Sequence, residues 1–240
     1  MRMTNRLACA AALALAIVSP ARADILLSEG FGNIGSLAGA GWSMVNNSTP
    51  GGSTGWMQGQ PGFFPAAAGA DDSYIAANFD NASFGGAISN WLITPTLAMG
   101  NGTQLDFMLR LLGEGFSDTV QVYLSTNGSS GDVGSTTSST GDFLQLLGTY
   151  SSVDDTGWVA ESLTLSGLAG DFSGRLAFRY VVDDTSAHGD YIGIDSVQVS
   201  SAAASATLPE PGSLALAGLA CACAALVRRR STAPPAPDAV

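Results

Sequence analysis

The sequence predicts an all-β protein, a jelly-roll-type antiparallel β-sandwich that occupies residues 24–200. Hydrophobic and polar residues alternate along several short segments, which is the pattern of a strand with one buried face. Clusters of Gly, Ser, Asn and Asp separate these segments, and the 30 glycines of the chain suit turns and bulges better than helices. A helical period of useful length is missing from this region of the sequence.

The clearest predicted strands lie in the second half of the region. Along residues 105–111, Leu105, Phe107, Leu109 and Leu111 point one way, while Asp106, Met108 and Arg110 lie between them. Residues 120–124 and 176–182 follow the same pattern. Many short strands with turn residues between them indicate a sandwich or barrel. Shorter candidates are, in chain order, residues 25–28, 74–78, 91–93, 144–149, 159–165, 191–194 and 197–199.

Two stretches are expected to be long surface loops. Residues 46–62 are rich in Gly, Ser, Thr and Asn, although they contain Trp56 and Met57. Residues 127–141 are almost wholly Gly, Ser and Thr, and their composition is typical of disorder. The small residues 201–207 are predicted to be a linker.

Residues 1–23 have the features of a secretory signal peptide, predicted to be helical. Arg2 and Arg6 form the charged start, and residues 7–18 form the apolar region. Ala21 and Ala23 are the small residues expected before the cleavage site. We therefore predict export and a mature chain that begins at Asp24.

A second apolar segment lies near the C-terminus. Pro209, Glu210 and Pro211 precede an apolar run over residues 212–227, and Arg228, Arg229 and Arg230 follow it. Such a run is predicted to be a transmembrane helix whose arginines stay on the cytoplasmic side. It is short for a span of about 17–25 residues and rich in Ala and Gly, which favours a transient hold in the inner membrane.

Residues 208–230 resemble the PEP-CTERM sorting signal of Gram-negative bacteria, with a plain C-terminal anchor as the alternative. The resemblance implies processing near the Pro-Glu-Pro triplet by the membrane enzyme exosortase. It also implies that the inner-membrane intermediate is passed to the outer cell surface or the extracellular matrix. The sequence continues past the arginines with residues 231–240, which are predicted to be a disordered tail.

Charge and cysteine content narrow the function classes. The chain has no Lys, and residues 24–200 contain 18 acids against three arginines, a net charge of −15. This excess argues against binding to nucleic acid or to an anionic membrane surface, and it is compatible with divalent cations. The three cysteines are Cys9, Cys221 and Cys223, so the predicted exported domain has neither a disulfide framework nor a thiolate metal site.

A set of landmarks recurs in order along residues 25–200. They are Leu27-Ser28-Glu29-Gly30-Phe31, Gly41-Trp42, residues 90–95, Leu105-Asp106-Phe107, residues 120–126, Gly157-Trp158, residues 176–180 and residues 192–197. Their order is similar to that of choice-of-anchor J domains, which are related to cleaved-adhesin and MAM-like sandwiches. The resemblance implies a jelly-roll sandwich used for adhesion or carbohydrate binding, often with a structural calcium ion.

The resemblance suggests one metal site. In related sandwiches the first and last strands meet, so Glu29 and Asp195 are expected to share a calcium ion, with loop carbonyls completing its six to eight oxygen ligands. The family commonly has two acids before the last strand, whereas the second position here is Ser196. The alternative is that each carboxylate only caps a turn or lies in solvent.

Trp56 is the predicted ligand-binding residue, because it lies in a polar loop and aromatic rings stack on sugars. A loop around His188, the only histidine, carries Asp183, Asp184 and Asp190 and is expected to be a solvated acidic loop or a second cation site. A histidine-based zinc site is excluded.

The sequence indicates a non-catalytic protein. Ser53 matches the nucleophile-elbow pattern in letters, but no strand and helix are predicted around it. No catalytic residue is assigned. We expect adhesion or polysaccharide binding at the cell surface or in the matrix. A structural matrix component without a discrete ligand and a secreted β-sandwich hydrolase are the alternatives.

Overall fold

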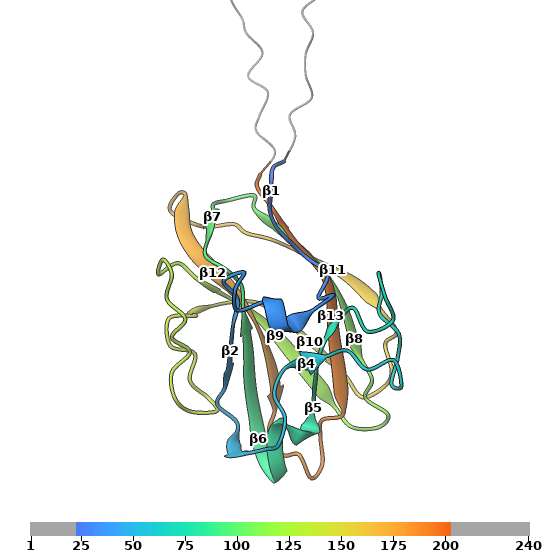
Figure 1. Ribbon diagram of the computed structural model, residues 1–240. Coiled ribbons are helices and arrows are strands. Elements are labelled where there is room, and N and C mark those ends of the chain that lie inside the picture. Colours follow the sequence, from blue (N-terminus) through green and yellow to red (C-terminus); the bar gives the residue numbers. More distant parts are fainter. Residues whose placement is uncertain (1–22, 203–240) are drawn as a thin grey trace, which may run out of the picture. The chain divides into compact units, whose positions relative to one another are not determined.

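The computed structural model describes residues 23–202, which form a two-sheet antiparallel β-sandwich with two short 3-10 helices, η1 (Ile34–Ser36) and η2 (Phe79–Asn81) (Figure 1). The predicted all-β class and antiparallel sandwich are confirmed. The predicted signal helix and transmembrane helix lie outside the described residues. Within residues 23–202, no helix is both long and apolar enough to cross a membrane.

The first sheet has six strands arranged around β13. The C-terminal half of β13 (Tyr191–Ser200) pairs with β1 (Ile25–Glu29), and its N-terminal half pairs with β5 (Ile75–Asn78). The strand β8 (Gln104–Leu111) runs along the other edge of β13. The predicted strands 191–194 and 197–199 are a single strand with a bulge between Asp195 and Gln198. In sheet order the strands are β11 (Val159–Thr164), β8 (Gln104–Leu111), β13 (Tyr191–Ser200), β5 (Ile75–Asn78) and β4 (Met57–Gln58), with β1 (Ile25–Glu29) beside β13.

The second sheet has seven strands arranged around β12. Here β12 pairs with β9 on one side and with β6 on the other. The strand β6 is much longer than the predicted segment 91–93. In sheet order the strands are β10 (Gln145–Ser152), β9 (Asp118–Ser125), β12 (Phe172–Val182), β6 (Ala82–Ile93) and β2 (Ser43–Asn46), with β3 (Thr49–Gly51) beside β6 and β7 (Leu97–Met99) beside β12.

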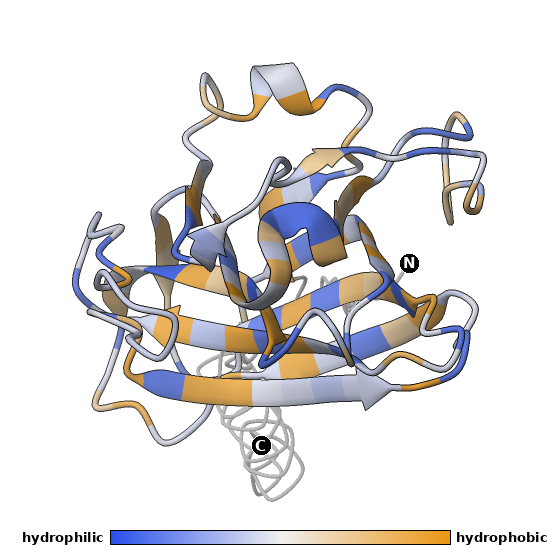
Figure 2. Cartoon of the chain, turned by 90° about the horizontal axis from the view of Figure 1, so that it is seen from below, coloured by the Kyte–Doolittle hydropathy of each residue, from blue (hydrophilic) through white to orange (hydrophobic). Residues whose placement is uncertain are grey.

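The main core lies between the two sheets. Hydrophobic residues (orange) alternate with more polar residues (white or blue) along strands in Figure 2, as the sequence pattern predicts. On β8, Leu105, Phe107, Leu109 and Leu111 are all buried. Phe107 packs edge-to-face against Phe178 of the opposite sheet, with 5.0 Å between ring centroids. The apolar face of each strand therefore packs against the other sheet.

A loop covers the outer face of the second sheet. The composition of residues 127–141 predicts disorder, but the structure packs this loop on the sheet. Val133 and Phe143 are buried, and Phe143 packs against Trp91 of β6 at 5.7 Å between ring centroids. A few apolar side chains at the ends of a polar segment are thus enough to dock it.

Arg179 of β12 fixes the same loop from below. The residue is 5% exposed, and its guanidinium lies 4.9 Å from the Trp91 ring centroid and donates to Ser89 Oγ at 3.0 Å. It also donates to the carbonyl of Thr137 in the loop. Burial lowers the pKa of Arg179, but an arginine stays charged even so. The buried charge therefore needs the loop carbonyl as a partner.

The loop between β4 and β5, together with a cluster of aromatic side chains, covers the outer face of the first sheet. Phe64 stacks near Tyr74 and meets Trp158 edge-on, at centroid distances of 5.1 and 5.5 Å. The guanidinium of Arg110 lies 4.3 Å from the Phe64 ring centroid and forms a two-pronged ion pair with Asp155.

Both ends of the described unit leave from the same end of the sandwich, because Ile25 pairs with Ser200 (Figure 1). The β5–β6, β8–β9 and β12–β13 connections lie at the opposite end. All three apolar clusters are made of residues between 26 and 199. The described unit thus contains complete cores, and we expect it to fold without the terminal segments.

Candidate functional site

The end of the sandwich opposite Ile25 and Ser200 contains a pocket of about 370 Å³, which we call the distal pocket. Its walls come from η2, the start of β6, the β8–β9 loop and the β12–β13 loop. Its volume lies at the low end of the range of about 300–1,000 Å³ that holds small ligands. The lining residues are Phe79, Phe84, Glu114, Phe116, Thr185, Ser186, Gly189 and Asp190.

Three phenylalanines of the distal pocket are exposed to solvent. Phe84 is 86% exposed, Phe116 48% and Phe79 44%. Exposed rings of this size do not contribute to the core, and a group of them around a hollow marks a binding surface. Aromatic rings provide flat apolar faces on which a ligand can stack.

Asp118 holds the loops of the distal pocket together from beneath. This first residue of β9 is fully buried. Its Oδ1 accepts hydrogen bonds from the Asp190 amide at 2.8 Å and from the Tyr180 hydroxyl at 2.7 Å. Its Oδ2 accepts from the Gly113 amide at 3.3 Å. One carboxylate thus connects the β8–β9 and β12–β13 loops.

Backbone bonds fix the remaining walls. The Phe79 amide donates to the carbonyl of Asp190 at 3.0 Å. Thr185 donates through its amide to the Gly86 carbonyl at 2.9 Å and through Oγ1 to the Ser83 carbonyl at 2.8 Å. The shape of the distal pocket is therefore set by main-chain contacts between elements far apart in the sequence.

The distal pocket is acidic. The pKa of Asp190 is raised to about 6, first because of partial burial and then because of the negative charges of Asp118 and Glu114. Burial also raises the pKa of Asp118, although its three hydrogen-bond donors oppose the shift. Two carboxylic groups, those of Glu114 and Asp190, line the hollow itself.

Three non-glycine residues of the described chain have a positive φ angle, and all lie at candidate sites. Glu114, at φ 43°, is in the distal pocket, while Phe31 and Ser196, at φ 50° and 51°, flank the predicted calcium residues. The left-handed region is unfavourable for residues with a side chain. Such strain gathers where a site requires a particular backbone path.

The structure brings the predicted calcium residues onto neighbouring strands. Glu29 of β1 pairs with Val197 of β13, two residues from Asp195. Asp195 is fully buried, and its Oδ2 accepts from the Ala68 amide at 3.0 Å. Burial raises the pKa of Asp195. Glu29 is half-buried, and its Oε1 accepts from the Phe31 amide at 2.7 Å.

Gln58 connects the segment after Glu29 with the loop near Asp195. Its Nε2 donates to the carbonyls of Phe31 and Asp72 at 2.7 and 2.6 Å, and its Oε1 accepts from the Ile34 amide at 3.0 Å. A buried carboxylate, a second carboxylate nearby and a loop with carbonyl groups are oxygen donors of the kind calcium takes. Within residues 23–202, no group of three or more His, Cys, Asp or Glu side chains could hold a metal ion. A calcium ion here would therefore rely on main-chain carbonyls and water.

The structure places Trp56, the predicted ligand-binding residue, away from solvent. Its side chain is 8% exposed and belongs to the core between the sheets. Segment 46–62 contains β3 and β4, which bring Trp56 inward. The indole nitrogens of Trp56 and Trp42 are buried without a hydrogen-bond acceptor. Because the Trp56 ring is buried, a sugar cannot stack on it.

The sorting and cleavage residues lie at or beyond the limits of the structure. Ala23 is the first described residue, and Ala21, Pro209, Glu210, Pro211 and the arginines 228–230 lie outside the described residues.

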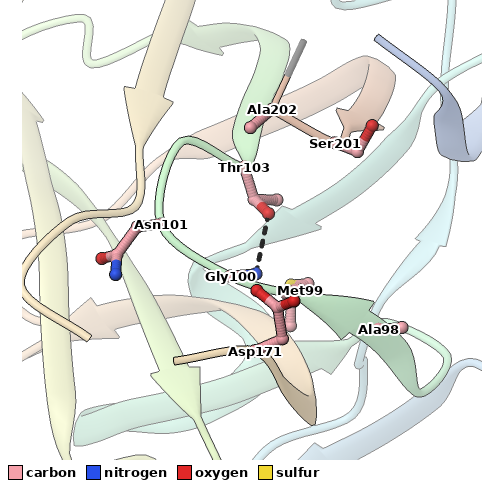
Figure 3. A pocket seen from close by; sticks show the side chains of 8 residues that line it. All are labelled: Ala98, Met99, Gly100, Asn101, Thr103, Asp171, Ser201 and Ala202. Atoms are coloured by element: carbon pink, nitrogen blue, oxygen red, sulfur yellow. Dashed lines mark hydrogen bonds between the residues drawn. The ribbon is translucent and has the colours of Figure 1, made fainter. Parts of the chain in front are cut away.

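A second pocket, of about 270 Å³, lies where the chain leaves the sandwich and contains Asp171 next to Ser201 and Ala202 (Figure 3). Its amide–hydroxyl bond between Gly100 and Thr103 closes a turn. The pocket has one carboxylate and no aromatic ring, so it offers less for binding.

The predicted acidic loop is split between two surfaces. His188 Nδ1 lies 2.7 Å from Asp183 Oδ1 on the exposed side, and Asp184 caps Ser186. Asp190 turns toward the distal pocket.

The phenylalanines of the distal pocket were not singled out from the sequence. The sequence feature that could have revealed two of them is a Phe next to glycine, as in Phe84-Gly85-Gly86 and Gly115-Phe116. Glycines indicate a turn, and a Phe in a turn is not expected to be buried in a strand.

Solved adhesin domains share this fold. The K3 cleaved adhesin domain of the Lys-gingipain of Porphyromonas gingivalis W83 matches with a TM-score of 0.51 and 18% identity, over 75% of this chain and 99% of that chain. The K1 domain of the same protein gives a TM-score of 0.50 and 22% identity, over 72% and 96%. No family model and no curated protein match the chain. At this identity the likeness shows the fold alone, a two-sheet antiparallel β-sandwich.

Proposed function

We propose that the protein is an exported, non-catalytic surface or matrix protein that binds polysaccharide or mediates adhesion through the distal pocket. The single observation that carries the proposal is the group of Phe79, Phe84 and Phe116 exposed around an acid-lined hollow. Sugars present apolar C–H faces and hydroxyls, which match rings and carboxylates respectively. The adhesin-like fold is compatible with this role.

The position of the pocket supports the proposal. The distal pocket lies at the end opposite the point where the chain leaves toward residues 208–230. A sorting signal of the PEP-CTERM type processed by exosortase would then deliver the domain to the outer surface or the matrix of a Gram-negative cell. Calcium at Glu29 and Asp195 is proposed as a structural ion that fixes the first and last strands.

The test of binding uses residues 23–202 and, in parallel, the full-length chain. Isothermal titration against a panel of oligosaccharides and the exopolysaccharide of the producing strain should show saturable binding. Phe84→Ala should weaken it strongly, whereas Phe63→Ala, which truncates an exposed Phe stacked on Tyr191 on the outer face of the first sheet, should not. A folded domain that binds no glycan would overturn the proposal and favour a structural matrix role.

The same panel tests the hydrolase alternative. Glu114 and Asp190 are acids in one pocket, and a carboxylic acid of raised pKa is also what a glycosidase uses as its general acid. Chromatography of each oligosaccharide after prolonged incubation should show it intact. A hydrolysis product that forms with the unchanged protein but not with Glu114→Gln would identify an enzyme and contradict the non-catalytic role.

Export and sorting need a separate experiment in cells. Replacing Pro209, Glu210 and Pro211 with alanines should leave the protein in the inner-membrane fraction. The unchanged protein should reach the surface or the medium. Equal distribution of both proteins would contradict sorting through this motif.

A further inference from the structure

The charged groups around the distal pocket are almost all acidic. Glu114 and Asp190 line it, Asp118 of β9 lies beneath it, and Tyr180 of β12 donates its hydroxyl to Asp118. In the β12–β13 loop the only basic group is His188, which pairs with Asp183. Asp80 follows Phe79 in η2. No neighbouring element therefore brings a permanent positive charge to the pocket lining.

The arginines of the described residues are engaged elsewhere. Arg110 pairs with Asp155 on the outer face of the first sheet. Arg179 is buried beneath the loop at residues 127–143. Arg175 donates to Thr96 and Ser43. With 18 acids in residues 24–200 and no Lys, the positive charge that the pocket lacks has to come from a ligand.

The rings and the carboxylates of the pocket favour the same kind of ligand. An ammonium group is attracted to the faces of aromatic rings and to carboxylates alike. It would also relieve the repulsion among Glu114, Asp118 and Asp190 that contributes to the raised pKa of Asp190. A glycan that carries carboxylates would meet only repulsion here. A neutral glycan would stack on the rings but would offer the two acids only uncharged hydroxyl donors.

We propose that the distal pocket selects glycans whose amino sugars carry free, unacetylated amines. The inference rests on the proposed glycan binding and names the class of ligand. Phe84 and its neighbours would stack on the sugar ring, and Glu114 and Asp190 would pair with the ammonium group. Thr185 and Ser186, at the rim, lie where sugar hydroxyls would come.

The test compares three glycans of similar length on residues 23–202 and on the full-length chain at pH 6.5, where the weakly basic amine of an amino sugar is partly protonated and Asp190 is largely ionised. The probes are chitosan oligosaccharide, its N-acetylated counterpart, and an oligouronate. Isothermal titration should give binding of the amine form about tenfold or more tighter than the acetylated form. Binding of the oligouronate should be undetectable.

Two variants separate pocket pairing from general attraction to an acidic protein. Glu114→Gln with Asp190→Asn should remove the preference for the amine form. The charge-matched pair Asp132→Asn with Glu161→Gln, outside the pocket, should keep it. Phe84→Ala should weaken both glycans, and its ring is too exposed for the fold to depend on it.

The outcomes distinguish the two proposals. Equal or tighter binding of the acetylated glycan, or equal effects of the two charge-matched pairs, would overturn the amine selection while glycan binding stands. Binding of the oligouronate alone would also overturn it. Loss of binding to every probe by a well-folded protein would overturn the glycan-binding proposal as well.

Discussion

The Oδ1 atom of Asp118 lies 2.8 Å from the backbone nitrogen of Asp190, so a buried carboxylate at the start of β9 fixes the loop that ends at β13. The same carboxylate accepts from Tyr180 and from Gly113. Two loops of the distal pocket are thus fixed by one residue that has no solvent contact.

Replacing Asp118 with Asn should destabilise the protein by about 1–3 kcal/mol. The amide keeps one acceptor oxygen but turns a second donor toward a backbone N–H, which leaves a buried group unsatisfied. Chemical denaturation is the measurement, and Glu161→Gln on β11 is the control. A variant as stable as the parent would show that the three hydrogen bonds contribute little.

Asp190→Asn should stabilise the protein at high pH only. The folded-state pKa of about 6 lies above the ordinary value of 3.8, so the stability linked to this group is fully present below about pH 3.8 and is lost as pH rises through about 6. The variant should gain about 1 kcal/mol or less at pH 8, because solvent screens a partly exposed group. Melting temperatures from pH 4 to 8 test this. A constant difference across that range would contradict it.

Binding of amine-bearing glycan should weaken as pH falls from 6.5 to 5. Protonation of Asp190 near pH 6 removes one of the two charges that face the ligand. The amine of an amino sugar is less basic than that of lysine and loses its proton near neutral pH, so binding should weaken above neutral pH as well. Titrations with chitosan oligosaccharide at several pH values give the measurement. In Asp190→Asn the pH dependence should be reduced, and an unchanged profile in that variant would assign the effect to another group.

Calcium should raise the melting temperature if Glu29 and Asp195 hold an ion. At a concentration one hundred times the dissociation constant, the gain in unfolding free energy is about 2.7 kcal/mol. Glu29→Gln should reduce the gain, and Glu161→Gln should not. The same melting temperature in calcium and in chelator would argue for two carboxylates that only cap backbone amides.

Arg179→Met should loosen the loop at residues 127–143. The change removes the donors to Ser89 and to the Thr137 carbonyl, at a cost of about 2–4 kcal/mol. Limited proteolysis should then cut within the loop before the rest of the domain. Arg175→Met is the matched control. Equal resistance in the two variants would mean that Val133 and Phe143 suffice to hold the loop.

The strands with regular alternation could be predicted from the sequence. The inward residues of β8, from Leu105 to Leu111, are buried as their period of two requires. The short strands β2, β3 and β4 could not be predicted, because they are only two to four residues long and their order comes from pairing with β5 and β6. The burial of Trp56 could not be predicted for the same reason.

The candidate sites differ in how far the sequence reveals them. Glu29 and Asp195 were named because they lie on the first and last strands of a recognisable order of landmarks. The distal pocket was not, since Phe79, Glu114 and Asp190 are far apart in the chain and meet only through antiparallel pairing. The period of alternation tells which face of a strand is buried, but it does not tell which loops share an end of the sandwich.

The position of β13 also determines how the domain would respond to pulling. Its C-terminal end leads toward residues 203–240, and it is hydrogen-bonded on both edges, to β8 on one side and to β1 and β5 on the other. Hydrogen bonds in an antiparallel sheet run perpendicular to the strands. A force along β13, between a ligand held at the far end and a cell attached at this one, would load these bonds together in shear instead of unzipping them in sequence. The strand order therefore suits the domain to bear tension.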